Sequence, residues 1–229
     1  MNTLAVIGSA SLARLPQWHT GARRIVRTPY GQPSAPLLEG EVGGRPVVFL
    51  CRHGLNNTIA PQLINYRANI WALHSIGVRR IVSVSAVRPL HDGFSAGELL
   101  LPHDLIDYTH SRESSFVERG TLENAYTDFT HPYDHALRDE LLALIRQSGM
   151  TAHEAAVYAC VQGARLPTAA EARRMRQDGA DVYGMTAMPE AILARELGMA
   201  YAHLCGVLAP ERDGSHPALD AVRRLIERL

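Results

Sequence analysis

The sequence has no excess of charge of either sign, because its 23 Lys and Arg residues are matched by 23 Asp and Glu residues. A neutral chain makes no long-range field that would attract nucleic acid or an anionic membrane surface. The sequence therefore predicts neither as a partner. Its basic residues are all arginines, and the planar guanidinium group suits geometric binding of small anions.

Cysteine and long apolar runs are also scarce. The three cysteines, Cys51, Cys160 and Cys205, lie in or beside short apolar runs without metal-ligand spacing. Such a pattern predicts buried thiols in a reducing compartment, so we expect a cytoplasmic protein. No apolar run has the length of a membrane span, and the opening run Leu4–Ile7 is too short for a signal peptide.

Several catalytic motifs are absent as well. The chain has no Gly-x-Ser-x-Gly elbow, no P-loop, no HExxH or Cys-x-x-Cys spacing and no paired-carboxylate arrangement. The loop Gly8–Ser11 does not supply the glycine fingerprint of a dinucleotide site, which argues against a Rossmann-type dehydrogenase. We expect no metal site and no bound cofactor.

Short apolar runs alternate with helical patterns along the 229 residues. Strands are predicted at 4–7, 47–51, 81–85, 157–161, 182–184 and 201–208, with a hairpin that joins Val42 to Val47 through Gly43-Gly44. Helices are predicted at 61–76, 132–147, 168–177, 189–197 and 217–228. The alternation predicts a single α/β domain over residues 1–229, with a mixed central sheet flanked by helices. The polar stretch 107–130 is expected to be a loop that could reach a neighbouring subunit.

Polar residues follow the predicted strands at their carboxyl ends, where α/β sheets bind ligands. Arg52-His53 closes the run 47–51 and offers two potential cations to an anion, although Arg52 could instead pair with a carboxylate of the next helix. The small-residue loop Gly8–Ser11 leaves N–H groups free to cradle a phosphate, with Ser9 and Ser11 as hydroxyl donors. Many ordinary strand-to-helix turns have the same composition.

Two further strand ends carry candidate groups. Ser85-Ala86 offers a backbone N–H to a phosphate oxygen, whereas Arg88 fills space that a glycine would leave open. Gly184-Met185-Thr186 places a thioether beside a hydroxyl, and such a methionine either packs on a ligand or fills an ordinary core. Glu190 follows as either a helix cap or a partner for a sugar hydroxyl.

Taken together, these segments resemble the methylthioadenosine phosphorylase branch of the trimeric purine nucleoside phosphorylases. The stretches that carry the resemblance are 28–36, 52–54, 65–73, 163–168 and 184–186 with 189–191. Two others, 102–109 and 157–163, are similar to members of that branch that act on S-methyl-5′-thioinosine. The similarity extends from the first strand to about Leu208.

The resemblance implies a reaction and a set of binding residues. The reaction is phosphorolysis of S-methyl-5′-thioinosine, or a related 6-oxopurine nucleoside, to hypoxanthine and 5-methylthioribose 1-phosphate, with inorganic phosphate as co-substrate and no covalent intermediate. Phosphate would contact Ser9, Ala10, Arg52, His53, Ser85, Ala86 and Thr186. Nucleoside would contact Met185, Thr168, Ala209, Pro210 and Glu211. A homotrimer is implied, in which His131 or the stretch 107–130 reaches a neighbour.

Three positions depart from the family pattern. Ala10 lacks the usual hydroxyl, Arg88 stands where a glycine is usual, and Ala209 replaces an Asn or Asp that addresses the purine. Glu211 or Asp213 could take over base recognition, and the C-terminal part that usually covers the 5′ substituent is shortened. The alternative hypothesis is therefore a degenerate, non-catalytic paralogue that binds nucleoside or serves in assembly.

Overall fold

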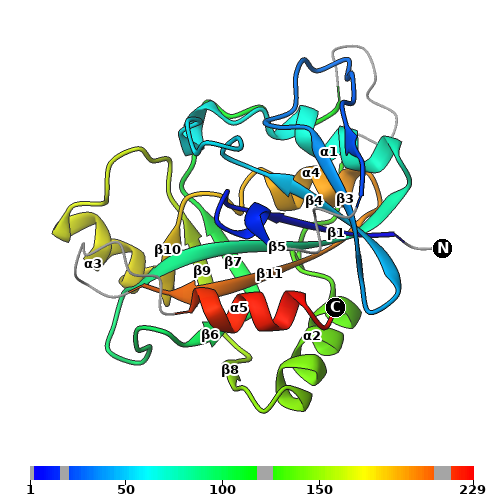
Figure 1. Ribbon diagram of the computed structural model, residues 1–229. Helices are drawn as coiled ribbons and strands as arrows, with labels where there is room; N and C mark the ends of the chain where they lie inside the picture. Colours follow the sequence, from blue (N-terminus) through cyan, green and yellow to red (C-terminus); the bar gives the residue numbers. More distant parts are fainter. Residues whose placement is uncertain (1–2, 16–20, 118–125, 209–217) are drawn as a thin grey trace.

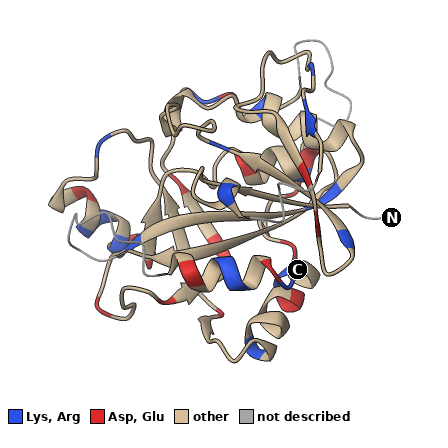
Figure 2. Ribbon diagram, in the orientation of Figure 1, with Lys and Arg blue, Asp and Glu red and all other residues tan. Residues whose placement is uncertain are grey.

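The structure is a computed structural model that describes residues 3–15, 21–117, 126–208 and 218–229. A mixed sheet runs through the molecule, and helices lie on both of its sides (Figure 1). Arg residues are interspersed with Asp and Glu along the ribbon in the view of Figure 2. The fold is α/β, as the sequence predicts.

The sheet is built from short and long strands that the chain visits out of spatial order. The strands are β1 (Thr3–Gly8), β2 (Arg23–Arg24), β3 (Leu37–Val42), β4 (Arg45–Cys51), β5 (Val78–Pro89), β6 (Leu99–Leu100), β7 (Asp104–Asp107), β8 (Ala152–His153), β9 (Val157–Cys160), β10 (Val182–Gly184) and β11 (Ala200–Val207). Their order is β2-β3-β4-β1-β5-β10-β9-β7, with β11 paired to β5, β6 to β11 and β8 to β6.

Two hydrophobic layers enclose the sheet. The helices are α1 (Tyr66–Ser75), α2 (His135–Gln147), α3 (Ala169–Gln177), α4 (Glu190–Glu196) and α5 (Leu219–Ile226). Along β1, Ala5 and Ile7 pack in the layer with α1 and α4, whereas Leu4 and Val6 pack in the layer with α2 and α5. This alternation follows from the two-residue period of a strand, and it buries β1 on both faces.

β5 organises the site because it changes partners along its length. Its first half pairs in parallel with β1 as far as Ser83, and its end pairs antiparallel with β10 from Arg88 onward. Between these two positions β5 is bonded to β11 on its other side only. The carboxyl ends of β1 and β10 therefore meet from opposite directions beside the middle of β5, which opens a gap in the sheet.

The predicted elements differ from the structure mainly at their ends. The helix predicted at 61–76 is a 3₁₀ turn, Pro61–Leu63, followed by α1, because the Asn65 side chain caps α1 by accepting the Ala68 N–H. The strand predicted at 81–85 extends to Val78–Pro89. Residues 108–117 and 126–130 form neither helix nor strand, as predicted for a loop. The single domain over 1–229 stays a prediction.

Candidate functional site

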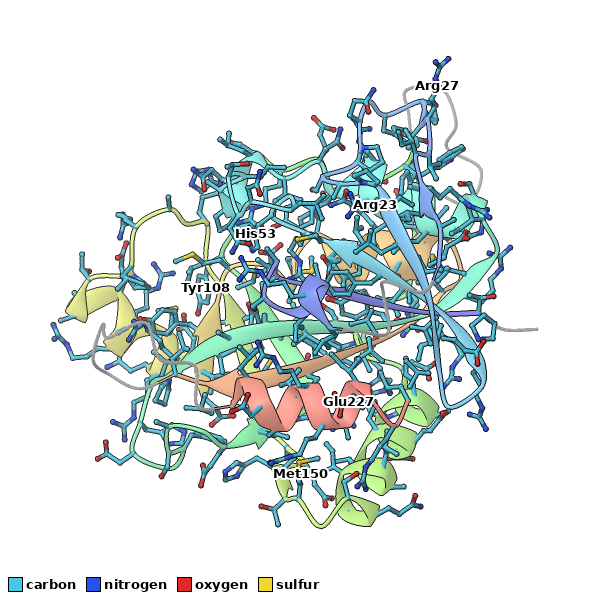
Figure 3. The ribbon with its side chains drawn as sticks, viewed as in Figure 1. Arg23, Arg27, His53, Tyr108, Met150 and Glu227 are labelled. Carbon is cyan, nitrogen blue, oxygen red and sulfur yellow. The ribbon has the colours of Figure 1, made fainter. Side chains whose placement is uncertain are left out.

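A pocket of about 410 Å³ lies at the gap beside the middle of β5. Its wall comes from the segments that follow β1, β4 and β10, from the ends of β10 and β11, from β5 itself and from α5. His53 is half-buried, whereas Arg27 is exposed and projects from the surface (Figure 3). The topology thus brings together segments from Ser9 near the start of the chain to Val222 near its end.

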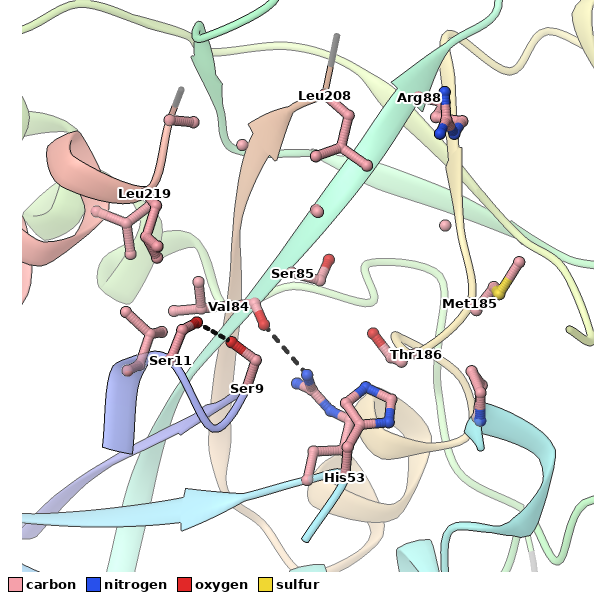
Figure 4. Close-up of a pocket in the computed structure, with 18 of the residues that line it drawn as sticks. Ser9, Ser11, His53, Val84, Ser85, Arg88, Met185, Thr186, Leu208 and Leu219 are labelled. Atoms are coloured by element: carbon pink, nitrogen blue, oxygen red, sulfur yellow. Dashed lines mark hydrogen bonds between the residues drawn. The ribbon is translucent and has the colours of Figure 1, made fainter. Parts of the chain in front are cut away.

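The segment after β1 contributes two hydroxyl groups. The Oγ atoms of Ser9 and Ser11 are 2.7 Å apart, and both residues line the pocket (Figure 4). Ala10 points into the protein instead: it is buried, and its N–H donates to the Asn57 side chain at 3.2 Å. Asn57 has a positive φ of 52°, which asparagine tolerates better than most residues, and it also lines the pocket.

Arg52 is held rigidly at the pocket floor. Its Nε and Nη2 donate to the Glu190 carboxylate at 2.8 and 3.0 Å, Nη2 also donates to Ser83 Oγ, and Nη1 donates to the Val84 carbonyl. Burial alone disfavours the charge, but the adjacent carboxylate raises the pKa of Arg52 above its usual range. These four bonds leave one of the five guanidinium N–H groups for another acceptor within the described residues.

The two open interpretations of Glu190 are both wrong, because its side chain forms neither a helix cap nor part of the pocket wall. Its carboxylate is fully buried and accepts from Arg52, from Ser83 Oγ at 2.6 Å and from Tyr201 OH at 2.9 Å. Arg52 is thus paired with a helix carboxylate, but this carboxylate belongs to α4 and not, as the alternative had it, to the next helix along the chain, α1. Arg52 nevertheless remains on the pocket wall.

His53 presents one ring nitrogen to the pocket. Nδ1 lies 2.8 Å from the Ile59 carbonyl oxygen, and this contact requires a proton on Nδ1. Burial, and then the charge of Arg52, lower the pKa of His53, so the ring is neutral at pH 7 in the unliganded protein. Only one of the two predicted cations, Arg52, is therefore charged before an anion binds.

Ser85 forms a hydrogen bond with a buried histidine. Its Oγ lies 2.7 Å from His203 Nε2, and His203 is fully buried with no partner at Nδ1 among the described residues. Burial, and then Arg52, lower the pKa of His203 to about 3, so the ring is neutral. If Nε2 carries the proton, Ser85 accepts from His203 and its own hydroxyl hydrogen is available to a ligand.

Thr186 offers a hydroxyl group that has no partner. Its Oγ1 is buried on the pocket wall without a hydrogen bond in the described part of the chain, although its backbone N–H donates to Tyr158 OH at 3.3 Å. Gly184 permits this packing, since an added Cβ would lie 2.3 Å from Tyr158 Oη. An orphaned buried hydroxyl is costly unless a ligand satisfies it.

These groups define one end of the pocket, which we call the oxyanion end: Ser9, His53, Ser85 and Thr186 lie around it (Figure 4). Arg52 lines the same pocket. An apolar side lies next to it, where α5 contributes Leu219 and Val222. The helix α5 thus forms part of the pocket wall.

Arg88 lies at the other end of the pocket, with Met185 between it and Thr186 (Figure 4). It is half-buried and does not fill the space among the groups of the oxyanion end. Arg88 therefore lies apart from the oxyanion end, and its effect on phosphate binding stays a prediction.

Two of the predicted site residues lie off the pocket wall. Ala10 is buried behind it, and the Thr168 hydroxyl caps α3 by accepting the Glu171 N–H. Ala209, Pro210 and Glu211 fall outside the described residues. The other predicted residues line the pocket: Ser9, Arg52, His53, Ser85, Ala86, Met185 and Thr186. Their roles in binding stay predictions.

Sequence reasoning missed several residues of the site. Asn57 and Leu166 line the pocket from loops, and the only signal for Asn57 is the tolerance of asparagine for a positive φ. Leu219 and Val222 belong to a helix that the sequence does predict, but its docking over the pocket depends on tertiary packing. His203 was unmarked because it sits in a strand pattern.

The arrangement suits a negatively charged group next to an uncharged ligand of moderate size. Hydroxyl groups and a guanidinium donate to oxyanions, and the cavity volume falls in the usual range for small-molecule sites. Within the described residues, no group of His, Cys, Asp and Glu side chains is arranged to hold a metal ion. No helix in that same part of the chain is long and apolar enough to cross a membrane.

The fold and the pocket thus define an α/β protein with an oxyanion site at the point where its sheet changes partners. Comparison with known families identifies the class: the chain belongs to the phosphorylase superfamily, whose model matches residues 4–227. The family resemblance noted in the sequence is thereby confirmed.

Individual relatives cover most of the chain. A probable S-methyl-5′-thioinosine phosphorylase of Pseudomonas syringae pv. tomato is 43% identical over 210 residues, which are 92% of this chain and 85% of the relative. The 6-oxopurine nucleoside phosphorylase of Pyrococcus furiosus is 41% identical over 207 residues, 88% of this chain and 77% of that one. A crystal structure of a methylthioadenosine phosphorylase from an antarctic soil metagenomic library superposes with a TM-score of 0.91 at 33% identity, and covers 100% of this chain and 85% of that chain.

Proposed function

We propose that the protein catalyses the phosphorolysis of S-methyl-5′-thioinosine, or of a related 6-oxopurine nucleoside, to hypoxanthine and 5-methylthioribose 1-phosphate in purine salvage. The relatives named for these substrates support the reaction. The observation that carries it is the oxyanion end of the pocket, above all the orphaned hydroxyl of Thr186 and the one remaining N–H of Arg52, two residues that line the same pocket. Inorganic phosphate is the co-substrate, and no cofactor takes part.

The reaction exchanges one bond for another at the anomeric carbon. A phosphate oxygen forms the new C1′–O bond while the C1′–N9 bond breaks and its electron pair leaves on the purine. The proton that hydrogen phosphate loses when it becomes an ester balances the one that completes hypoxanthine. The protein forms no covalent bond, so its contribution is positioning and electrostatic stabilisation of an oxocarbenium-like transition state.

The groups of the oxyanion end divide this task. Arg52 supplies a permanent positive charge beside the nucleophile, and Thr186 and Ser9 supply hydroxyl donors. A phosphate dianion close to His53 favours the imidazolium form, which then donates from Nε2 while Nδ1 keeps its bond to Ile59. One such donor to a developing charge is worth about 3 kcal/mol.

The apolar side of the pocket favours a 5′-methylthio group over a 5′-hydroxyl. Leu12, Leu219 and Val222 line it next to Ser11 and offer no polar atom from their side chains. A thioether loses little on leaving water, whereas a hydroxyl without a partner there loses its hydrogen bonds. We therefore include the methylthio substituent in the proposed substrate.

Assembly as a homotrimer and a cytoplasmic location belong to the same proposal. The family resemblance supports the trimer, and the buried cysteines fit a reducing compartment. Sedimentation velocity of the purified protein tests the trimer, which a monomer of 25.1 kDa at assay concentration would exclude.

The test of function is release of hypoxanthine in the presence and absence of phosphate. Methylthioinosine, inosine and methylthioadenosine are compared with folded protein, and the sugar product is identified as the 1-phosphate ester. We expect phosphate-dependent turnover that is fastest on methylthioinosine. Nucleoside binding by calorimetry with no turnover on any of the three would instead favour the non-catalytic hypothesis.

A further inference from the structure

Arg88 gives the pocket a second cationic position, separate from the oxyanion end. It stands three residues beyond Ser85 on β5, which corresponds to about 10 Å along an extended strand. Because side chains alternate along a strand, Arg88 shares a face with Ala86, whose exposed surface also lines the pocket. Figure 4 shows Arg88 apart from His53 and Thr186, beyond Ser85 and Met185.

Because phosphate displaces the base from C1′, we expect the purine to lie at this second position. In the proposed reaction, phosphate approaches C1′ from one side of the sugar and the base departs from the other. A phosphate at Ser9, His53 and Thr186 therefore directs the base away from them. Arg88 and Tyr183, whose Cα atoms are paired across β5 and β10, form the wall at that opposite end.

A guanidinium is complementary to one class of purine. The edge of a 6-oxopurine presents two neighbouring acceptors, O6 and N7, and the arginine fork donates to both at once. A 6-aminopurine has an amino group, which is a donor, in place of O6. The guanidinium would then find an acceptor at N7 only, and its second N–H would oppose the N–H of the amino group. A guanidinium has five N–H donors on more than one edge, so a protein partner on one edge leaves another for the base.

The same contact assists departure of the base. As the C1′–N9 bond breaks, negative charge spreads over the purine to N7 and O6. A cation held there stabilises the transition state more than the ground state, which is the condition for a faster chemical step. The arginine side chain keeps its proton at any working pH, so Arg88 acts as a hydrogen-bonding cation and transfers no proton.

We propose that Arg88 reads the O6/N7 edge of a 6-oxopurine, selects it against a 6-aminopurine and stabilises it as a leaving group. This inference rests on the proposed function for its orientation of substrate. It also assigns a purpose to a residue that departs from the family pattern.

The test compares Arg88→Met and Arg88→Lys with Arg80→Met. Arg80 is the control because it lies at the opposite end of β5, where it pairs with Glu140 on the surface. We expect Arg88→Met to lower kcat/KM on inosine or methylthioinosine about 10- to 100-fold, in line with the worth of a bidentate contact, and to change that on methylthioadenosine far less. Arg88→Lys keeps the positive charge but loses the planar pair of N–H donors. It should therefore retain part of kcat/KM on inosine but lose the preference for 6-oxopurines over 6-aminopurines.

A substrate with an activated base separates the two roles of Arg88. In 7-methylinosine, N7 carries a methyl group and the base already bears positive charge, so it leaves without help from a cation. Its turnover should not fall in Arg88→Met, because in the wild type the guanidinium faces a methylated, positively charged N7 instead of an acceptor. An equal loss on inosine, methylthioadenosine and 7-methylinosine would overturn the proposal, because it would indicate a general structural defect.

Binding of free bases keeps the inference testable if the wild type shows no phosphorolysis. Calorimetry with hypoxanthine and adenine then replaces the kinetic comparison. Tighter binding of hypoxanthine, lost in Arg88→Met and kept in Arg80→Met, would support the role of Arg88 although the proposed function fails. Equal affinity of the wild type for the two bases would refute it.

Discussion

The buried pair of Arg52 and Glu190 should be the most sensitive point of the fold. Glu190 Oε1 accepts from Arg52 Nη2, Ser83 Oγ and Tyr201 OH, and Oε2 accepts from Arg52 Nε. In Glu190→Gln, the new amide must point its NH₂ either at the Arg52 Nε–H or at three other donors. Either orientation sets the amide N–H against an Arg52 N–H, beside a guanidinium that is only 2% exposed.

The magnitude follows from the burial of both partners. Arg52 is 2% exposed and Glu190 is 0% exposed, so the guanidinium loses its counter-charge without gaining hydration. Removal of one member of a buried ion pair typically costs about 3–5 kcal/mol. We therefore expect Glu190→Gln to lower the free energy of unfolding by about 3 kcal/mol or more, a large part of the stability of an ordinary domain.

Urea unfolding at pH 7 provides the measurement, with Glu171→Gln as the matched control. Glu171 pairs with Arg165 in water at the start of α3, and glutamine keeps its capping-box acceptor. The control should change the unfolding midpoint far less than Glu190→Gln does. Equal midpoints for the two variants would refute the view that this pair supports the pocket floor.

A double variant separates stability from binding. Arg52→Met/Glu190→Met replaces both charges by apolar side chains, which often restores most of the stability that a single removal costs. Its KM for phosphate should nevertheless rise by ten-fold or more, because the cation at the oxyanion end is gone. A double variant that is stable and keeps the wild-type KM would exclude Arg52 from phosphate binding.

Three further outcomes follow from the site. Thr186→Val should raise the KM for phosphate about 10- to 100-fold, the worth of one hydrogen bond to a charged group, while thermal unfolding shows no loss of stability, since a buried hydroxyl without a partner disappears. Gly184→Ala should lower stability by about 1–3 kcal/mol, because the added methyl meets the Tyr158 hydroxyl; an unchanged melting temperature would contradict that packing. The pKa of His203 is about 3 in the folded protein and near 6.5 in the unfolded chain. The contribution of His203 to stability is therefore complete above pH 6.5. As the pH falls from 6.5 toward 3, the free energy of unfolding decreases by about 1 kcal/mol per pH unit. His203→Gln should reduce that slope in acid unfolding.

Local chemistry in the sequence was sufficient for the elements and for part of the site. The apolar runs at 4–7 and 47–51 are buried on both faces, which is why the sequence shows them as continuous strands. A capping box formed by Thr168 and Glu171 begins α3, where a helix is predicted at 168–177. The segments after β1, β4 and β10 carried recognisable polar groups because ligands bind at strand ends. Spacing along the chain suffices for such features, since each depends on residues a few positions apart.

Only the tertiary structure decided which of these groups face the pocket, which partners they pair with and whether they are charged. Arg52 and Glu190 are 138 residues apart, and their pairing depends on how α4 docks against the sheet. The neutral state of His53 and His203 comes from burial, which no local pattern reveals. The place of Arg88 at the far end of the pocket follows from the change of partner along β5, a property of the sheet as a whole and of no single segment.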